Sequence, residues 1–170
     1  MKLNRIYSNS LLYGTITALV CFAFFWGMTF VNPNPLGARR PDVGFNLLFV
    51  GLAMWQLKRD QQGILHFYQA FSVGFLTNLW AAFLTGFFLY LFIQIDPTPF
   101  QAWLKEGQAL LLAQRDTFDK ILNEETFQAQ LKSLQTAKPY QVWLDELMFK
   151  QVAIVGITLI GMVLRQKGAD

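Results

Sequence analysis

The sequence has little charge and almost no cysteine. Charged residues make up 15% of its 170 residues, whereas about 25% is usual in a soluble domain. Cys21 is the only cysteine, which excludes an intramolecular disulfide and a thiolate metal cluster. The formal net charge is +3, and the basic residues stand at the edges of apolar blocks. The chain therefore also lacks the basic patch of a nucleic-acid-binding protein, and we expect no nucleic acid partner.

The sequence also lacks the short motifs of common catalytic sites. It contains no nucleophile elbow, no phosphate-binding loop and no zinc-binding helix motif. His66 is the only histidine, and no Cys or second His stands near it to complete a metal site. We therefore expect no enzyme activity, no cofactor and no metal. We interpret His66 as a structural residue at a membrane interface.

Long apolar runs are abundant instead, and 54% of the residues are hydrophobic. About 20 helical residues cross the roughly 30 Å hydrocarbon core of a bilayer. The sequence therefore predicts an all-α integral membrane protein, a single domain over residues 1–170 with four transmembrane helices. The predicted spans cover about residues 11–31, 43–57, 71–95 and 147–164.

The second run is the shortest of the four. Its 15 residues make about 22 Å of helix. We expect it to cross the bilayer if Trp55 lies in the interfacial belt while Lys58 and Arg59 reach the headgroups.

An amphipathic helical insertion is predicted between the third and fourth spans, over about residues 98–138. Apolar residues recur there at helical spacing, Pro99 is typical of a first helical turn, and Asn123 is a candidate cap of a second helix. A helical hairpin or a broken helix satisfies this pattern. We expect its apolar face to lie on the outer leaflet or on the protein's own spans, and docking to a partner protein is the alternative.

Small and polar residues within the spans indicate close helix packing. Small residues let helix backbones approach, and amide or hydroxyl groups bond across helices. The same polar groups also offer a polar path for a solute, which is the less favoured interpretation. These residues are Gly14, Ala18, Gly74, Thr77, Asn78, Ala82, Thr85 and Gly86. Because most of them lie in the third span, we expect that helix to be central.

Five residues are predicted to anchor the protein at the membrane interfaces, because indole rings and long basic side chains favour the headgroup region. They are Trp26, Trp55, Trp103, Trp143 and Lys150. We further expect no charge deep within any span and a surface position for Asp145, Glu146 and Lys150. Ion-coupled transport normally needs buried charges, so this expectation argues against it.

Several short motifs resemble an uncharacterised bacterial family called domain of unknown function 4199. The matching stretches are Tyr13-Gly14, Gly63-Ile64-Leu65-His66-Phe67, Ala70-Phe71, Gly74 and Ile95-Asp96-Pro97. The resemblance extends over nearly the whole chain, although His66 stands where the family often has a small polar residue. It implies a four-span protein of the bacterial inner membrane, found mainly in Bacteroidota, and it implies no activity.

From these observations we expect a non-catalytic inner-membrane protein that acts through assembly. Its partners would be the lipid bilayer and other membrane proteins, either as an accessory subunit of a larger complex or by self-association. The alternative is a small channel or transporter with a polar path near Asn78.

The charge distribution predicts an orientation with both termini in the cytoplasm. The segments on that side would hold six basic and two acidic residues, whereas residues 96–146 hold five basic and eight acidic residues. This agrees with the excess of Lys and Arg on the cytoplasmic side of membrane proteins. Arg39 and Arg40 do not fit, since they fall on the outer side.

We therefore expect a reporter that is active only in the cytoplasm to be active when fused after Asp170 and inactive when inserted near Asn123. Reporter activity in whole cells measures this directly. The opposite pattern would show that the orientation is reversed.

Overall fold

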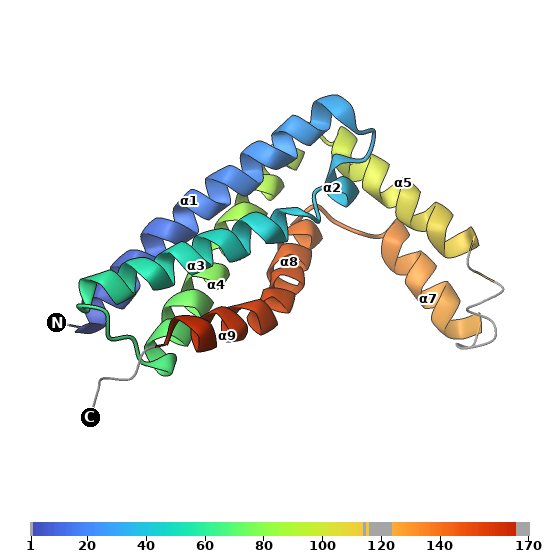
Figure 1. Cartoon of the computed structure of the whole chain (residues 1–170). Coiled ribbons are helices and arrows are strands. Elements are labelled where there is room, and N and C mark those ends of the chain that lie inside the picture. Colours follow the sequence, from blue (N-terminus) through green and yellow to red (C-terminus); the bar gives the residue numbers. More distant parts are fainter. Residues whose placement is uncertain (1, 114, 116–123, 166–170) are drawn as a thin grey trace.

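The computed structural model describes residues 2–113, 115 and 124–165, and the elements of this part of the chain are all helices (Figure 1). In chain order they are α1 (Lys2–Val31), α2 (Pro35–Ala38), α3 (Asp42–Asp60), α4 (Phe67–Ile95), α5 (Thr98–Ala113), α7 (Glu124–Gln135), α8 (Tyr140–Phe149), the 3₁₀ helix η1 (Lys150–Val152) and α9 (Ala153–Leu164).

Three helical stretches are long and apolar enough to cross a membrane, namely Asn4–Val31, Phe67–Ile95 and Tyr140–Leu164. They contain the first, third and fourth predicted spans, but each begins several residues earlier. The predicted runs are shorter because apolar composition marks only the part of a helix suited to hydrocarbon, while polar residues continue the same helix.

α3 forms where the second span is predicted, so the prediction of a helix over residues 43–57 is confirmed. It is 19 residues long and has Asp42 at its start and Lys58, Arg59 and Asp60 at its end. These terminal charges and its modest length distinguish it from the three candidate spans. That α3 crosses the bilayer stays a prediction.

The long helices form a bundle in which successive helices alternate in direction. In Figure 1 the starts of α1 and α4 lie at the same end of the bundle as the ends of α3 and α9. There, the guanidinium of Arg5 donates a hydrogen bond to the backbone oxygen of Asp60 at 3.0 Å. α4 contacts α1, α3, α8 and α9, which agrees with the central position expected for the third span.

Two hydrophobic clusters fill the two ends of the bundle. One is built around Leu57, Leu65 and Ile157, with Ile6 and Leu164 packed against it. The other joins α1, α2, α4, α5 and α8. Its buried members are Phe25, Leu36, Leu89, Ile93, Phe100 and Val142. The second cluster attaches the base of α5 to the bundle.

The turn between α3 and α4 depends on a left-handed backbone. Gln62 and Gly63 have φ angles of 57° and 91°, and the amide of Gly63 donates to the oxygen of Lys58 at 2.9 Å. Glycine adopts this conformation without steric cost. α4 then begins after His66, whose backbone amide donates to Oε1 of Gln69 at 3.3 Å, so His66 stands at a helix start.

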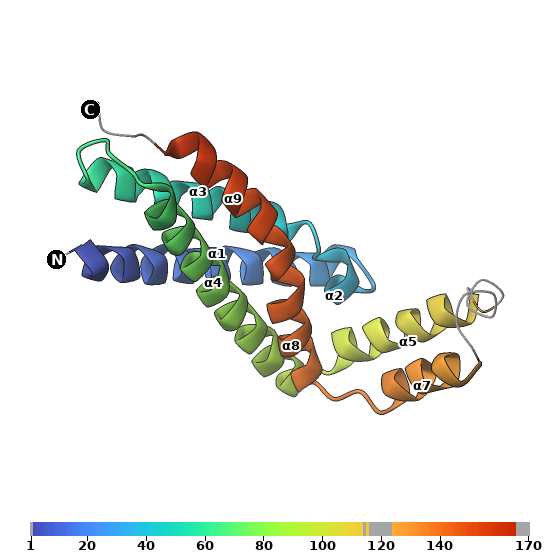
Figure 2. The ribbon, with the colours of Figure 1, turned by 90° about the horizontal axis from the view of Figure 1, so that it is seen from below.

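α5 and α7 pack against each other as a hairpin that leaves the bundle sideways (Figures 1 and 2). α5 begins at Thr98, one residue before Pro99. Hydrogen bonds from the side chain and the backbone amide of Thr98 lower the pKa of the Asp96 carboxyl. Asn123, the candidate cap of the second helix, lies outside the described residues.

Three glycines allow close approach of neighbouring side chains. A Cβ atom at Gly86 would lie 2.4 Å from Cδ1 and 3.2 Å from Cα of Trp143, and one at Gly74 would lie 2.3 Å from Cε of Met54. A Cβ at Gly14 would lie 2.9 Å from Cδ1 of Trp80. Gly74 and Gly86 let α4 approach α3 and α8, and Gly14 of α1 makes room for Trp80 of α4, so each of these contacts needs a small residue on one of its two helices.

Gly86→Ala should therefore destabilise the protein by about 1–3 kcal/mol, because the added methyl group forces Trp143 to move. Gly27→Ala is the matched control, since a Cβ there meets nothing within 4 Å and alanine favours a helix by up to about 1 kcal/mol. The free energy of unfolding in mixed detergent micelles measures both effects. Equal effects of the two substitutions would contradict this packing.

Candidate functional site

Four charged side chains meet inside the bundle where the α2–α3 connection, α8 and η1 converge. Arg39, Asp42, Glu146 and Lys150 are each at most 2% exposed. Two are basic and two are acidic, so their formal charges cancel. Charges are rarely buried in proteins unless they are paired, which makes this cluster the strongest candidate functional site in the described residues.

Glu146 lies between the two basic groups. One of its carboxylate oxygens, Oε2, pairs directly with Nη1 of Arg39, and the other, Oε1, lies 2.9 Å from Nζ of Lys150. Asp42 is held less closely, with Oδ2 at 3.5 Å from Nζ of Lys150 and 4.0 Å from Nη1 of Arg39. Glu146 and Lys150 are four residues apart and so share one helical face.

A second ion pair borders the buried cluster on the side nearer solvent. Nη2 of Arg40 lies 3.1 Å from Oδ2 of Asp145, and these side chains are 35% and 36% exposed. The Arg40 guanidinium also covers the ring of Phe149 at 4.1 Å from its centroid. The cluster therefore runs from a fully buried interior to a half-buried edge.

Polar groups of α3 and α4 extend the network into the centre of the bundle. Nδ2 of Asn46 donates to Oδ1 of Asn78, and Nδ2 of Asn78 donates to the backbone oxygen of Lys150 at 3.2 Å. Nζ of Lys150 donates to Oγ1 of Thr85 at 3.5 Å. Asn78 and Lys150 therefore connect α3, α4 and η1 through hydrogen bonds that cross between helices.

The last candidate span is interrupted at this network. η1 tightens the helix at Lys150–Val152, and the oxygen of Lys150 accepts from both the Ala153 amide and the Asn78 side chain. A side chain that enters the helical ladder is one cause of helix bends. The sequence predicts one continuous run here, because nothing in residues 147–164 signals a break.

Asp42 and Asn46 keep acceptor atoms that no donor reaches. Among the described residues, both carboxylate oxygens of Asp42 and Oδ1 of Asn46 are buried and accept no hydrogen bond. Only charge therefore holds the Asp42 side chain, through Lys150 and Arg39.

The structure corrects three expectations about charge. Lys150 is not an interface anchor, because its ammonium is buried against Glu146 and Asp42. Glu146 and Lys150 do not belong to a surface cluster, although Asp145 is partly exposed. Contrary to the expectation that charges stay at the ends of the spans, both residues lie inside the candidate span Tyr140–Leu164. The physical reason is that α8 begins at Tyr140, so these two residues lie on inner turns of one long helix.

The sequence analysis did not predict Arg39, Asp42 or Asn46 as site residues, because two of them precede the second apolar run and the third lies within it. Spacing was the available signal. Glu146 and Lys150 are four residues apart, and so are Asp42 and Asn46, which puts each pair on one helical face. Spacing cannot show that the two faces meet.

The residues predicted for packing or a polar path, Gly14, Ala18, Gly74, Thr77, Asn78, Ala82, Thr85 and Gly86, are all buried. Thr77 bonds within its own helix, to the oxygen of Val73 at 2.7 Å. Asn78 and Thr85 join the charge network, while the glycines and alanines form contact surfaces.

The predicted tryptophan anchors differ in their surroundings. Trp26 and Trp55 are exposed on the bundle surface, and the Arg59 guanidinium covers the ring of Trp55 at 5.0 Å. Trp103 packs against the cluster at the base of α5. Trp143 lies among the rings of Phe83, Phe87 and Tyr90. It thus takes part in packing α8 on α4.

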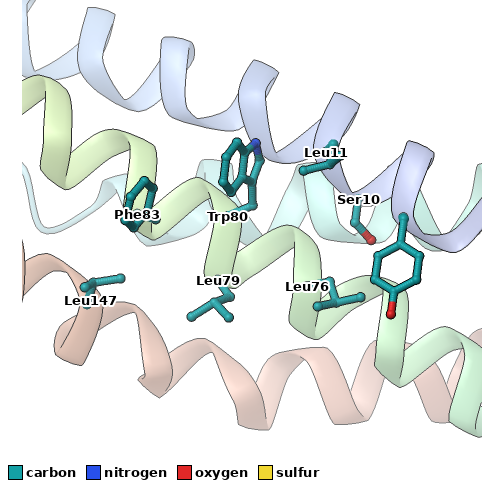
Figure 3. A pocket seen from close by; sticks show the side chains of 8 residues that line it. Ser10, Leu11, Leu76, Leu79, Trp80, Phe83 and Leu147 are labelled. Atoms are coloured by element: carbon teal, nitrogen blue, oxygen red, sulfur yellow. The ribbon is translucent and has the colours of Figure 1, made fainter.

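An apolar groove on the side of the bundle is the second candidate site (Figure 3). Its volume is ≈ 370 Å³, and α1, α4 and α8 line it with Tyr7, Ser10, Leu11, Leu76, Leu79, Trp80, Phe83 and Leu147. The polar atoms of its floor point away, because Ser10 donates to the oxygen of Val73 and the Trp80 indole donates to Thr15. The groove therefore offers almost only apolar surface.

The described residues form helices, and three of the helical stretches are long and apolar enough to cross a membrane, so the chain is of the helical membrane-protein class. A family model described as "Protein of unknown function (DUF4199)" matches residues 12–165. The chain belongs to this family, and the resemblance noted in its motifs is confirmed. No curated protein and no solved structure matches the chain.

Glu146→Gln should lower the free energy of unfolding by about 3–5 kcal/mol, because it removes the charge that pairs with Arg39 and Lys150. Asp145→Asn is the matched control, since its half-exposed pair should contribute about 1 kcal/mol or less. Adding Lys150→Met to Glu146→Gln restores the charge balance and should recover part of the loss. Unfolding in mixed micelles measures all three, and a Glu146→Gln effect no larger than that of Asp145→Asn would contradict the network.

Proposed function

We propose that this protein is a non-catalytic protein of the bacterial inner membrane that acts by assembly with a transmembrane helix of another chain. That chain is a second copy or a partner subunit. The single observation that carries the proposal is the apolar groove between α1, α4 and α8, which is lined by residues of all three candidate spans.

The proposal includes four crossings and cytoplasmic termini. The 19 residues of α3 extend over about 28 Å, close to the roughly 30 Å of hydrocarbon. Arg39 pairs with Glu146 and Arg40 with Asp145. Because both arginines have acidic partners in the bundle, their place at the outer end of the spans is compatible with this orientation.

The shape of the groove suits a helix. Leu76, Leu79 and Phe83 follow α4 at intervals of three and four residues, and Tyr7 and Leu11 do the same on α1. Such rows form ridges along a helix, and the ridges of one helix pack into the grooves of another. Hydrophobicity alone does not drive association in lipid, so a fitted surface of this kind is what distinguishes a helix-binding site.

The charge network supports a scaffold role. Its acidic and basic side chains pair with one another, and Asn78 forms hydrogen bonds to α3 and to η1. Groups engaged in this way hold α3, α4 and the bent last span in a fixed arrangement. A fixed bundle keeps the groove in shape for a partner, because less ordering is then required on binding.

The rival function is a small channel or transporter with a polar path near Asn78. The observation that favours it is the buried Asp42 carboxylate, which accepts no hydrogen bond and lies close to Lys150. Buried ionisable groups in membrane proteins often mark ion or proton pathways. In this rival, protons or small cations would pass along Asp42, Lys150, Thr85 and Asn78.

A photoreactive amino acid at position 79, in the groove, should crosslink in native membranes several-fold more than the same amino acid at position 48. Leu79 lines the groove, whereas Leu48 is exposed on α3 and does not. Mass analysis of the adduct identifies the occupant. A second copy or another membrane protein supports the proposal, and a lipid adduct alone overturns it.

The assembled mass in mild detergent provides an independent test. Leu79→Trp should lower it, because the larger side chain fills the groove. A strictly monomeric wild-type protein without a co-purifying partner would contradict the proposal. Ion flux through vesicles that contain this monomer would then favour the rival.

A further inference from the structure

Short connections fix the height of the α5–α7 hairpin relative to the membrane. Two residues separate the end of α4 from the start of α5, and four separate α7 from α8. Both connections are hydrogen-bonded, with the Thr98 amide on Oδ1 of Asp96 and the Lys138 amide on Oε1 of Gln141. Because α4 and α8 belong to candidate spans, the hairpin starts and ends within a few residues of the bilayer surface.

The hairpin runs across the direction of the long helices of the bundle. Figure 1 shows α5 and α7 running across the direction of α1, and Figure 2 shows that they extend beyond the bundle. The base of α5 is fastened by buried Phe100. A hydrogen bond from Nδ2 of Asn34 to Oε2 of Glu106 holds α5 against the start of α2. The direction of the hairpin is therefore set by contacts with the bundle.

One face of α5 continues from the bundle to the outside. Trp103, Glu106 and Leu110 are three, four and seven residues apart, so they share this face. Trp103 packs on the bundle cluster and Glu106 bonds to Asn34. Leu110 lies one turn further out and is 55% exposed. Leu110 thus lies on the face of α5 that contacts the bundle through Trp103 and Glu106, but it extends beyond those contacts and is exposed.

The rest of the hairpin has different surfaces. Leu111 and Phe127 are buried where α5 and α7 meet. Leu112 is 53% exposed and lies two residues from Leu110, on nearly the opposite side of α5. α7 exposes mainly polar side chains, which are Glu124, Glu125, Gln128, Gln130, Lys132, Ser133 and Gln135.

We propose that the α5–α7 hairpin lies on the lipid bilayer, with Leu110 inserted at the boundary between headgroups and acyl chains and Leu112 directed to water. Amphipathic helices bind membranes in this manner, parallel to the surface, and tryptophan such as Trp103 favours the same depth. This surface is separate from the groove, so the inference goes beyond the assembly proposal and does not depend on it.

The test compares Leu110→Cys with Leu112→Cys, two positions of equal chemistry and similar exposure on one helix. Each variant of the full chain is labelled with an environment-sensitive fluorophore and reconstituted in phosphatidylcholine–phosphatidylglycerol vesicles. Cys21 is buried, and the unsubstituted protein reports its background labelling. Brominated lipid should quench the label at position 110 several-fold more than the label at 112, and aqueous iodide should show the reverse preference.

Other outcomes would overturn the inference. Iodide quenching of both labels would mean that the hairpin stands in water. Protection of position 110 from both quenchers would indicate a protein contact, and loss of that protection on dilution with lipid would identify a second copy. The quenching of labels at positions 110 and 112 is independent of crosslinking at position 79. A negative quenching result would therefore contradict the hairpin inference without contradicting the assembly proposal.

Discussion

Glu146 pairs with both Arg39 and Lys150, and this pairing constrains how the surrounding helices can pack. Removing charges from water costs several kcal/mol per ion, and the bundle buries four of them together. Glu146 makes this possible because each of its oxygens meets one positive group. The connection before α3 is thereby attached to α8. An arrangement of the helices that separated these partners would leave a buried charge unpaired and would therefore be higher in free energy. The pairing thus favours one packing of the helices.

The network also coincides with the bend of the last candidate span and with the polar side of α4. Asn78 bonds to the oxygen of Lys150 at the 3₁₀ segment, so the bend occurs where a side chain enters the helical ladder. α4 then separates two environments. Asn78 and Thr85 face the charges, whereas Leu76, Leu79 and Phe83 line the apolar groove. One helix thus contributes a polar surface to the interior and an apolar surface to the outside.

The positions of small residues were predictable, because a helix that is surrounded by others must be narrow where they touch it. Gly74 and Gly86 show this, with Met54 and Trp143 lying where a Cβ would stand. The role of Lys150 was not predictable in the same way. A lysine near the end of an apolar run reaches headgroups in most settings, whereas Lys150 turns to Glu146 and to Asp42, which lies 108 positions earlier in the chain.

Hydrophobic run length and local motifs are properties of neighbouring residues, so the long helices, the three strongly apolar stretches and the family could be predicted from the sequence. The buried network of Arg39, Asp42, Glu146 and Lys150 and the exposed position of Leu110 on α5 became apparent only in the folded bundle. The physical reason is that charge pairing and burial depend on which helix faces meet. Residues far apart in the chain supply those faces, and local periodicity carries no information about their partners.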